Sequence, residues 1–424
     1  MHKIFSFQAK KTIEYKYNHI CLRKECLVNT IGTVGSDTID ALFSAISPQQ
    51  DQYDSLANNA LSRGTGFYQQ GNYEGAVKEF QRSIGLSPHS SYTQNAYDYM
   101  VQSLLKLNRT DDAIKAYRQA INLDPTNDSY YVNLGNIYFS LGRYNEAKSE
   151  YNEAVKINPT STLNWYSLGQ ASMQTGNYAG AEEAFKTVNA YSPGEATFAL
   201  GQIYHLMGRY DDAVTELKSA ISVNKDFGYA YFELGYVYAD RKEFKEAQEQ
   251  VSILSSIDQS MALQLSSYIY QQKSPQILAA YTTDFTGTGA PGTKVSDLDP
   301  LLAEPNASVF FTMHFIFSKA MDASTVASPA YWSITKADGQ NRGGVYNWGL
   351  PLAPTEVSIS PIPVSVVYHQ NSQTADVVFQ VTQNASGNAT LDPSHLVFKF
   401  QGLDVYGKAM DPAADEYSRI SMIV

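Results

Sequence analysis

The chain has 424 residues, which is more than one domain usually holds, so its length predicts two or three folding units. A hydrophobic fraction of 43% with 17% charged residues is typical of a globular protein, and no apolar run approaches the ~20 residues of a bilayer-spanning helix. The net charge of −11, without a basic stripe, argues against nucleic acid or anionic lipid as a partner.

Residues 1–27 differ from the rest of the chain, because six basic residues against two acidic ones give them a net charge of +4 and leave −15 for the remainder. They hold both cysteines, Cys21 and Cys26, and lack the apolar core of a signal peptide. We expect this segment to be disordered or a mis-assigned upstream extension, since codons for Arg23–Glu25 can spell a ribosome-binding site and Val28 can be a GTG start. Without a signal peptide or membrane span, we expect a cytoplasmic protein, with signal-less export to the cell surface as the alternative.

Residues 28–56 form an N-terminal segment rich in Thr, Ser, Ala and Gln. Apolar residues at helical spacing predict one short helix over Thr38–Ser47, formed by Ile39, Leu42, Phe43 and Ile46. We expect this helix to be loosely held or to cap the helical region that begins at Ala57.

A single pattern occurs twice between Asp128 and Pro193, shifted by about 34 residues. The first occurrence consists of Tyr131, Leu134, Gly135, Tyr138, Gly142, Tyr144, Ala147, Tyr151, Ala154 and Pro159. The second consists of Trp165, Leu168, Gly169, Ser172, Gly176, Tyr178, Ala181, Phe185, Val188 and Pro193. This period and these residue types resemble the tetratricopeptide repeat, a helix, a tight turn and a second antiparallel helix.

About six such repeats are predicted over residues 57–272, although Val101 replaces glycine in the second and Lys225 replaces proline in the fifth. Small residues at Gly135 and Ala147 allow the two helices of a repeat to approach, and Gly142 suits a left-handed helix exit. A last amphipathic helix around Ser260–Gln271 is expected to cap the open end, with Met261, Leu263, Leu265 and Ile269 on its apolar side.

The resemblance implies that the first helix of each repeat lines a concave groove that binds peptides. Its candidate residues form a ladder of amides beside two rows of mostly apolar side chains. The amides are Gln102, Asn136, Gln170 and Gln202; the rows are Val132, Tyr166, Phe198 and Phe232, then Phe139, Met173 and His205. Amides donate and accept, so such a ladder suits an extended peptide backbone, while the aromatic residues suit apolar side chains. The alternative is that these residues only line a solvated inner surface. The Lys/Arg set with which chaperone-binding repeats hold a terminal carboxylate is missing.

After Gln272 the helical periodicity ends, and residues 273–300, rich in Thr and Gly, are predicted to be a linker. From Ser308 apolar residues alternate at period two, which predicts a strand through Val309, Phe311, Met313, Phe315 and Phe317. Turn signals separate further strand candidates: Tyr331–Thr335, Val357–Ile359, Val364–Tyr368, Ala375–Val381 and Leu396–Gln401. Residues 301–424 are therefore predicted to form a β-sandwich.

Two segments stand out in this region: Phe317–Asp322 with Ser324–Val326 and Tyr331–Ile334, and, near its end, Asp404–Asp411. They resemble the opening and closing segments of bacterial surface-layer-type immunoglobulin-like domains. The predicted fold class is an α-solenoid of about six repeats followed by an all-β immunoglobulin-like sandwich. The resemblance implies a structural or adhesive module of an exported protein.

No arrangement of acid, base and nucleophile indicates an enzyme, and nothing indicates a cofactor or a metal-binding histidine cluster. Asp404, Asp411, Asp415 and Glu416 are candidate calcium ligands, with a solvated loop as the alternative. The favoured function is a non-catalytic protein-interaction scaffold that binds an extended partner peptide. The alternative is a structural component or assembly factor of a bacterial surface appendage or layer.

Overall fold

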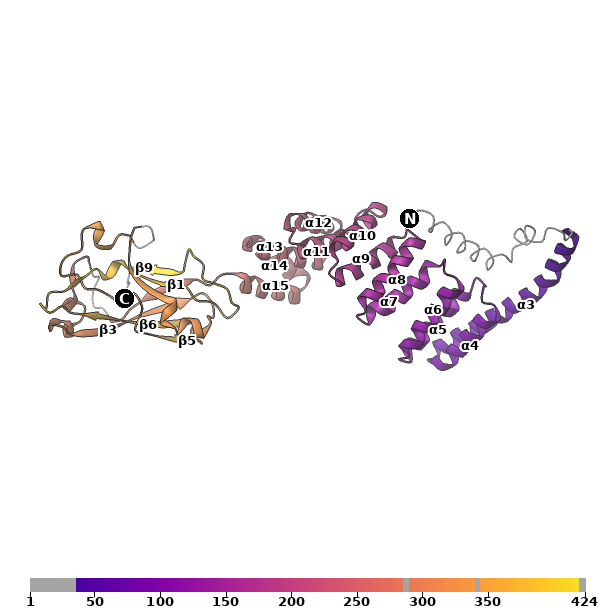
Figure 1. Ribbon diagram of the computed structural model, residues 1–424, viewed down its shortest axis with the longest axis horizontal. Coiled ribbons are helices and arrows are strands. Elements are labelled where there is room, and N and C mark those ends of the chain that lie inside the picture. Colours follow the sequence, from indigo (N-terminus) through magenta and orange to yellow (C-terminus); the bar gives the residue numbers. More distant parts are fainter. Residues whose placement is uncertain (1–35, 285–289, 340–343, 419–424) are drawn as a thin grey trace, which may run out of the picture. The chain divides into compact units, whose positions relative to one another are not determined.

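The computed structural model describes residues 36–284, 290–339 and 344–418, with side chains from residue 49 onward. The predictions for residues 1–27 lie outside this range. The chain divides into two compact units, Met1–Gly208 and Arg209–Val424, and each is described by itself. Helices α3–α11 belong to the first unit, and helices α12–α15 and all described strands belong to the second (Figure 1).

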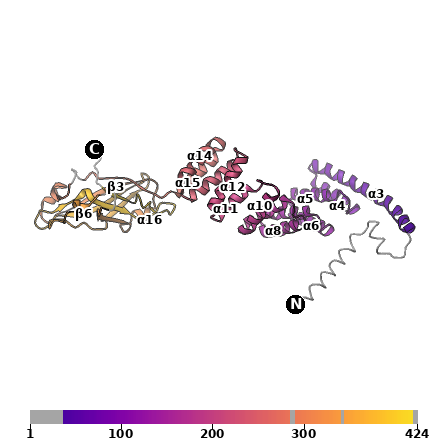
Figure 2. The ribbon, with the colours of Figure 1, turned by 90° about the horizontal axis from the view of Figure 1, so that it is seen from above.

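The first unit is a succession of helices in which each contacts the next along the chain (Figures 1 and 2). Their bounds are α3 (Ser36–Gln69), α4 (Tyr73–Leu86), α5 (Thr93–Lys106), α6 (Thr110–Leu123), α7 (Asp128–Ser140), α8 (Tyr144–Ile157), α9 (Thr162–Gln174), α10 (Tyr178–Tyr191) and α11 (Thr197–Leu206). The predicted short helix Thr38–Ser47 lies inside α3, which continues unbroken into the first repeat.

Glycine sets the distance between the two helices of a repeat, as predicted. A Cβ atom on Gly135 would lie 2.6 Å from the Tyr151 ring, and one on Gly169 would lie 2.6 Å from the Phe185 ring. The turn also follows the prediction, because Gly142 has φ +71° and the next amide closes helix α7 through a bond of 2.9 Å to the Tyr138 carbonyl. These two repeats, and the first one with Gly64 and Phe80, therefore place an aromatic ring of the second helix on a bare glycine of the first.

The second unit continues with α12 (Tyr210–Val223), α13 (Gly228–Asp240), α14 (Phe244–Ile257) and α15 (Gln259–Gln272). The last of these is the predicted final helix; it contacts both α13 and α14, and Figure 2 shows it beside α14. Leu265 fills the space above Gly235, where a Cβ atom would lie 2.2 Å away. Leu263, which was expected on the apolar side, is 61% exposed.

The strands of the second unit form antiparallel sheets. Their bounds are β1 (Ile277–Tyr281), β2 (Thr293–Lys294), β3 (Ser308–Phe317), β4 (Trp332–Lys336), β5 (Ser365–His369), β6 (Thr374–Thr382), β7 (Thr390–Leu391), β8 (Leu396–Phe400) and β9 (Glu416–Ser418). One sheet has the order β1-β3-β6-β5, another has β4-β8-β9, and β2 pairs with β7. A short helix, α16 (Ala323–Val326), follows β3.

Two sequence assignments differ from this topology. Strand β1 lies within the segment predicted as a linker and pairs with β3. Its sequence, Ile-Leu-Ala-Ala-Tyr, has no alternation that would reveal a strand. Val357–Ile359 forms no strand; its neighbour Glu356 makes only an isolated bridge to Thr390. The other strand candidates correspond to β3, β4, β5, β6 and β8.

The two larger sheets face each other across a core of aromatic side chains. The Phe315 ring of β3 lies 4.9 Å from the Trp332 ring of β4 and 5.8 Å from the Phe398 ring of β8, and Phe379 of β6 lies 5.4 Å from Phe398. Because these pairs join strands of different sheets, the region has the predicted sandwich arrangement.

A buried ion pair connects the two segments that resemble immunoglobulin-like domains. The Lys319 ammonium lies 2.6 Å from the Asp404 carboxylate, and both side chains are at most 2% exposed. The same ammonium donates to the carbonyl oxygens of Tyr270 and Lys273, which end helix α15. This lysine therefore compensates the charge of a buried carboxylate and donates hydrogen bonds to carbonyl oxygens at the end of a helix.

Candidate functional site

The predicted peptide-binding residues lie on the first helices of successive repeats. Gln102 and Asn136 are exposed, and the other eight are half-buried: Phe139, Tyr166, Gln170, Met173, Phe198, Gln202, His205 and Phe232. Nine lie in the first unit, on α5, α7, α9 and α11, and Phe232 lies on α13 in the second. Val132, which was placed in the same row, is only 6% exposed and belongs to the core.

Neighbouring first helices contact one another through side chains about one repeat apart. The Tyr68 hydroxyl of α3 donates to Gln102 Oε1 of α5 at 3.3 Å, and Asn133 Nδ2 of α7 donates to Asp98 Oδ1 of α5 at 3.1 Å. These contacts join α3, α5 and α7 to one another. We call the first helices of the first unit, α3, α5, α7, α9 and α11, the first-helix row.

Tyrosine hydroxyls orient two of the predicted amides. Tyr151 donates to Asn136 Oδ1 at 2.7 Å, as Tyr68 does to Gln102 Oε1. Burial raises the pKa of Tyr151 to about 12, so its hydroxyl keeps its proton at neutral pH. With their carbonyl oxygens occupied, these amides offer mainly N–H donors to a ligand.

The aromatic members of the set also pack within the protein. The Phe139 ring lies 5.1 Å from the Tyr144 ring, the Tyr166 ring 5.4 Å from Phe185, and the Phe232 ring 4.8 Å from Tyr236. Each therefore presents only part of its surface outward. For these residues, core packing and ligand contact are compatible roles.

Sequence reasoning missed Asp98, which stands one repeat before Val132. Its Oδ1 accepts hydrogen bonds from the Tyr117 hydroxyl at 2.8 Å and from Asn133 Nδ2, and no ion pair reaches it from another described residue. Burial raises its pKa, although the bonds from Tyr117 and Asn133 oppose that effect. An uncompensated carboxylate in this row is a candidate partner for a cation.

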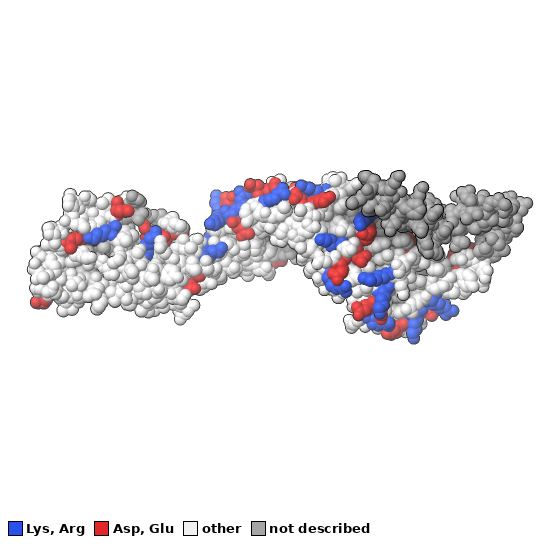
Figure 3. Space-filling model, viewed as in Figure 1, with Lys and Arg blue, Asp and Glu red and all other residues white. Residues whose placement is uncertain are grey.

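Charge is distributed unevenly between first and second helices. Helices α9 and α11 contain no Lys, Arg, Asp or Glu, whereas α8 and α10 contain five and three. Most ion pairs of the repeats involve second helices, such as Arg143–Glu146 and Arg109–Asp112. Figure 3 shows Lys and Arg side by side with Asp and Glu on the helical region, while the visible face of the β-sandwich is mostly uncharged.

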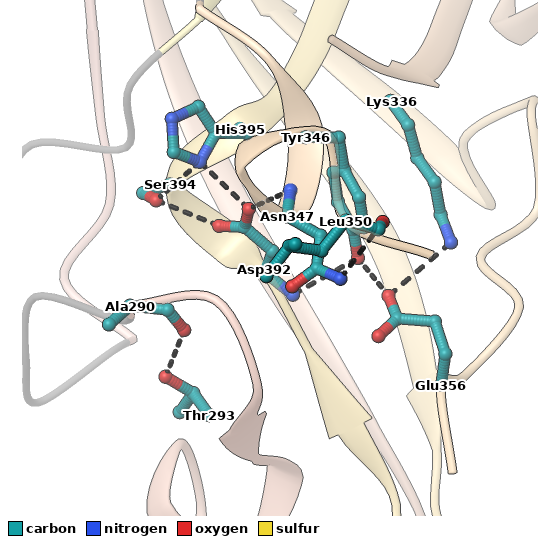
Figure 4. Close-up of polar contacts among 10 residues, drawn as sticks. All are labelled: Ala290, Thr293, Lys336, Tyr346, Asn347, Leu350, Glu356, Asp392, Ser394 and His395. Atoms are coloured by element: carbon teal, nitrogen blue, oxygen red, sulfur yellow. Dashed lines mark hydrogen bonds and ion pairs between the residues drawn. The ribbon is translucent and has the colours of Figure 1, made fainter. Parts of the chain in front are cut away.

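A second polar cluster lies in the β-sandwich and superficially resembles a hydrolase triad (Figure 4). Asp392 Oδ2 lies 2.8 Å from His395 Nδ1, and Ser394 Oγ lies 3.0 Å from the same nitrogen. In a Ser-His-Asp triad the serine and aspartate contact opposite ring nitrogens, so this arrangement cannot relay a proton to a serine.

The cluster instead holds a loop. Buried Asp392 accepts the backbone N–H of Asn347 at 2.7 Å, and the Tyr346 hydroxyl bonds to both the Asp392 N–H and Glu356 (Figure 4). Asn347 and Trp348 both have left-handed backbones, at φ 50° and 54°. The polar contacts therefore stabilise a conformation that such residues rarely adopt.

The structure does not assemble the candidate calcium ligands. Asp404 is paired with Lys319, and Asp415 lies 3.2 Å from Lys399 Nζ. Within the described residues, no group of three or more His, Cys, Asp or Glu side chains is arranged to hold a metal ion. Asp404 and Asp415 therefore form ion pairs with lysines and not a shared calcium site.

Comparison with protein families identifies the repeats. A model described as TPR repeat matches residues 102–142, 135–176 and 201–241, and one described as tetratricopeptide repeat matches residues 166–217. Residues 102–241 therefore contain tetratricopeptide repeats arranged as a solenoid. No curated protein matches the sequence.

Several solved structures are similar over part of the chain. MamA is 25% identical, with 40% of this chain and 95% of MamA covered and a TM-score of 0.35. A tetratricopeptide repeat protein from Parabacteroides merdae is 16% identical, covering 51% and 86% at a TM-score of 0.44. YrrB, a TPR protein with an unusual peptide-binding site, is 20% identical, covering 45% and 100% at 0.39. At these TM-scores the likeness does not extend to function.

None of the helices in the described residues combines the length and the apolar character that crossing a bilayer requires.

Proposed function

We propose that this protein is a non-catalytic interaction scaffold whose first-helix row binds an extended segment of a partner protein. Tetratricopeptide repeats support a role in protein–protein interaction, and nothing in the described chain points to an enzymatic activity. The observation that carries the proposal is the orientation of the amides, since Tyr68 and Tyr151 occupy the carbonyl oxygens of Gln102 and Asn136. Their N–H groups would donate to the backbone carbonyls of the bound segment.

The charge and the apolar side chains of the first-helix row indicate which side chains the bound segment would carry. Helices α9 and α11 are uncharged, so acidic or basic runs would find no complementary charge there. Half-buried aromatic and sulfur side chains, such as Tyr166 and Met173, would receive apolar side chains of the partner. Asp98 would pair with a single lysine or arginine of the segment.

The test is peptide selection on the full-length chain, followed by binding measurements with the selected peptide. The variant Asn136→Ala/Gln170→Ala/Gln202→Ala removes three hydrogen-bonding groups, and we expect roughly a hundredfold weaker binding with unchanged helicity. The control Gln119→Ala/Asn152→Ala removes exposed amides from second helices and should leave affinity unchanged. Equal affinity of the triple variant and the parent would show that the row is not the site.

A second candidate, a structural or assembly role at a bacterial surface, is favoured by one observation. The two segments that resemble surface-layer-type immunoglobulin-like domains contact each other through Lys319–Asp404 and the bridge between Met321 and Asp404. Cell fractionation tests this role, because a purely cytosolic pool of the protein would exclude it.

A further inference from the structure

Lys242 has a left-handed backbone at a position where the other repeats have glycine or asparagine. The second residue after the first helix has a left-handed backbone in each case: Gly71, Gly142, Gly176 and Gly208, with Asn108 at φ 57° and Lys242 at φ 63°. The next amide, of Glu243, bonds to the Tyr238 carbonyl at 2.8 Å, as in the glycine-ended helices. A lysine in this conformation is disfavoured by the contact of its Cβ with the backbone, so Lys242 lowers stability relative to a glycine at the same position.

This lysine lines a cleft within the second unit, beside the end of helix α15. The cleft has a volume of about 670 Å³, and its walls include Lys242, Phe244, Tyr270, Gln272, Lys273 and Gln276. Lys242 also borders an adjoining cleft of about 460 Å³, whose wall includes Lys408. We call the two together the lysine cleft.

Two of its positive charges are not compensated inside the protein. Lys242 and Lys273 are exposed, and neither ammonium makes an ion pair or hydrogen bond with another described residue. Lys273 Nζ lies over the Phe244 ring at 5.6 Å. Four lysines, Lys242, Lys273, Lys319 and Lys408, line the lysine cleft against two aspartates, Asp240 and Asp411. The lining is therefore net positive in a chain whose net charge is −11.

The other charged groups at the cleft make polar contacts within the protein, but hydrogen bonds from uncharged donors leave the negative charges of Asp411 and Asp240 in place. Lys319 is paired with Asp404 at 2.6 Å, and Lys408 Nζ donates to Gln272 Oε1 at 2.7 Å. Asp411 accepts from Gln276 Nε2 at 2.7 Å and from the Ala413 N–H at 3.0 Å. In the adjoining cleft, Asp240 accepts from the Tyr268 hydroxyl at 2.5 Å.

We propose that the lysine cleft binds an acidic segment of a protein partner, whose carboxylates pair with Lys242 and Lys273. Lysine ammonium groups are compact charges that suit carboxylates at variable positions along a peptide. The neighbouring amides and the rings of Phe244 and Tyr270 suit a peptide backbone and its side chains, which favours a peptide over a small inorganic anion. This site is separate from the first-helix row.

The test uses the full-length protein and a fluorescein-labelled hexaglutamate peptide, with binding followed by anisotropy at low salt. We expect Lys242→Gly/Lys273→Gln to weaken binding roughly tenfold, because exposed charge pairs contribute modestly one by one. Added salt should weaken binding to the parent protein, and hexaglutamine should bind at least as weakly as hexaglutamate binds the variant.

Lys242→Gly has an advantage as a probe, since glycine relieves the left-handed strain and should raise the melting temperature. Asn108→Gly changes the same backbone position on another repeat without touching the cleft, and it should leave peptide affinity unchanged. Unchanged affinity in the double variant overturns the proposal, as does equal binding of hexaglutamine. Displacement of the peptide by an equimolar amount of inorganic phosphate would also overturn it, by assigning the site to a simple anion.

Discussion

The helical repeats of the first unit are stabilised by contacts within single repeats, whereas the β-sandwich of the second unit is stabilised by one cluster that several strands share. In the repeats, one ring of a second helix rests on one glycine of its own first helix, as Tyr151 rests on Gly135, and this pair recurs along the chain. In the sandwich, aromatic residues of several strands form one cluster across two sheets, centred on Phe315 and Phe398. A destabilising substitution in one repeat should therefore loosen mainly that repeat and its neighbours. A destabilising substitution in the aromatic cluster should lower the stability of the whole sandwich.

The largest expected effect is the loss of Phe315. This side chain is fully buried between Trp332 and Phe398, so Phe315→Ala should cost about 3–5 kcal/mol of the sandwich's free energy of unfolding. Phe310 lies on the same strand with 56% of its side chain exposed, and Phe310→Ala should change stability by no more than about 0.5 kcal/mol. Denaturation followed by tryptophan fluorescence measures the difference, because Trp332 touches the altered site.

The second expected effect, which is smaller, is a difference in stability between alanine substitutions at two glycines of the helical repeats. A methyl group on Gly169 would lie 2.6 Å from the Phe185 ring, whereas one on Gly66 would meet nothing within 4 Å. Gly169→Ala should cost about 1–3 kcal/mol through overpacking, and Gly66→Ala should gain about 0.5–1 kcal/mol through helix propensity. Urea denaturation followed by far-ultraviolet circular dichroism would contradict this account if both changes had the same sign.

The fold of the repeats was predictable because their packing is local. Glycine and its aromatic partner, such as Gly169 and Phe185, stand in one repeat, so the spacing in the sequence already encodes the contact. The sandwich was harder to delimit. Strand β1 pairs with β3, which starts 27 residues after β1 ends by sequence number, and its short apolar run carries no periodicity of its own.

The candidate site was predictable only in its positions. The spacing placed Asn136 and Gln170 on first helices, but the tyrosine that holds Asn136 Oδ1 depends on side-chain geometry. Asp98 was missed because its row was defined from Val132 onward by apolar residues. Its partners Tyr117 and Asn133 lie on different helices, and no spacing in the sequence announces that they converge on one carboxylate.

The smallest expected effect concerns Asp98 and depends on pH. Burial raises the pKa of Asp98, so the folded state binds the proton of this carboxyl group more tightly than the unfolded state does. The contribution of Asp98 to the free energy of unfolding therefore falls as pH rises from the unfolded-state pKa through the folded-state pKa. Asp98→Asn keeps an oxygen that accepts from Tyr117 and Asn133 but carries no charge. We expect the variant to be more stable than the parent at neutral pH, with the difference shrinking as pH falls toward about 4.

Asp112 gives the matched comparison on the next helix. Its pKa is lowered, chiefly by the hydrogen bond from Arg109, so its contribution to stability is present at neutral pH and is lost as pH falls. Asp112→Asn should therefore destabilise the protein at neutral pH, the opposite sign to Asp98→Asn. Tyr117 and Tyr130 remain neutral throughout, because burial raises their pKa values as well. If a lysine-containing peptide bound to the first-helix row removes the pH dependence of the parent, the uncompensated charge of Asp98 is what that partner neutralises.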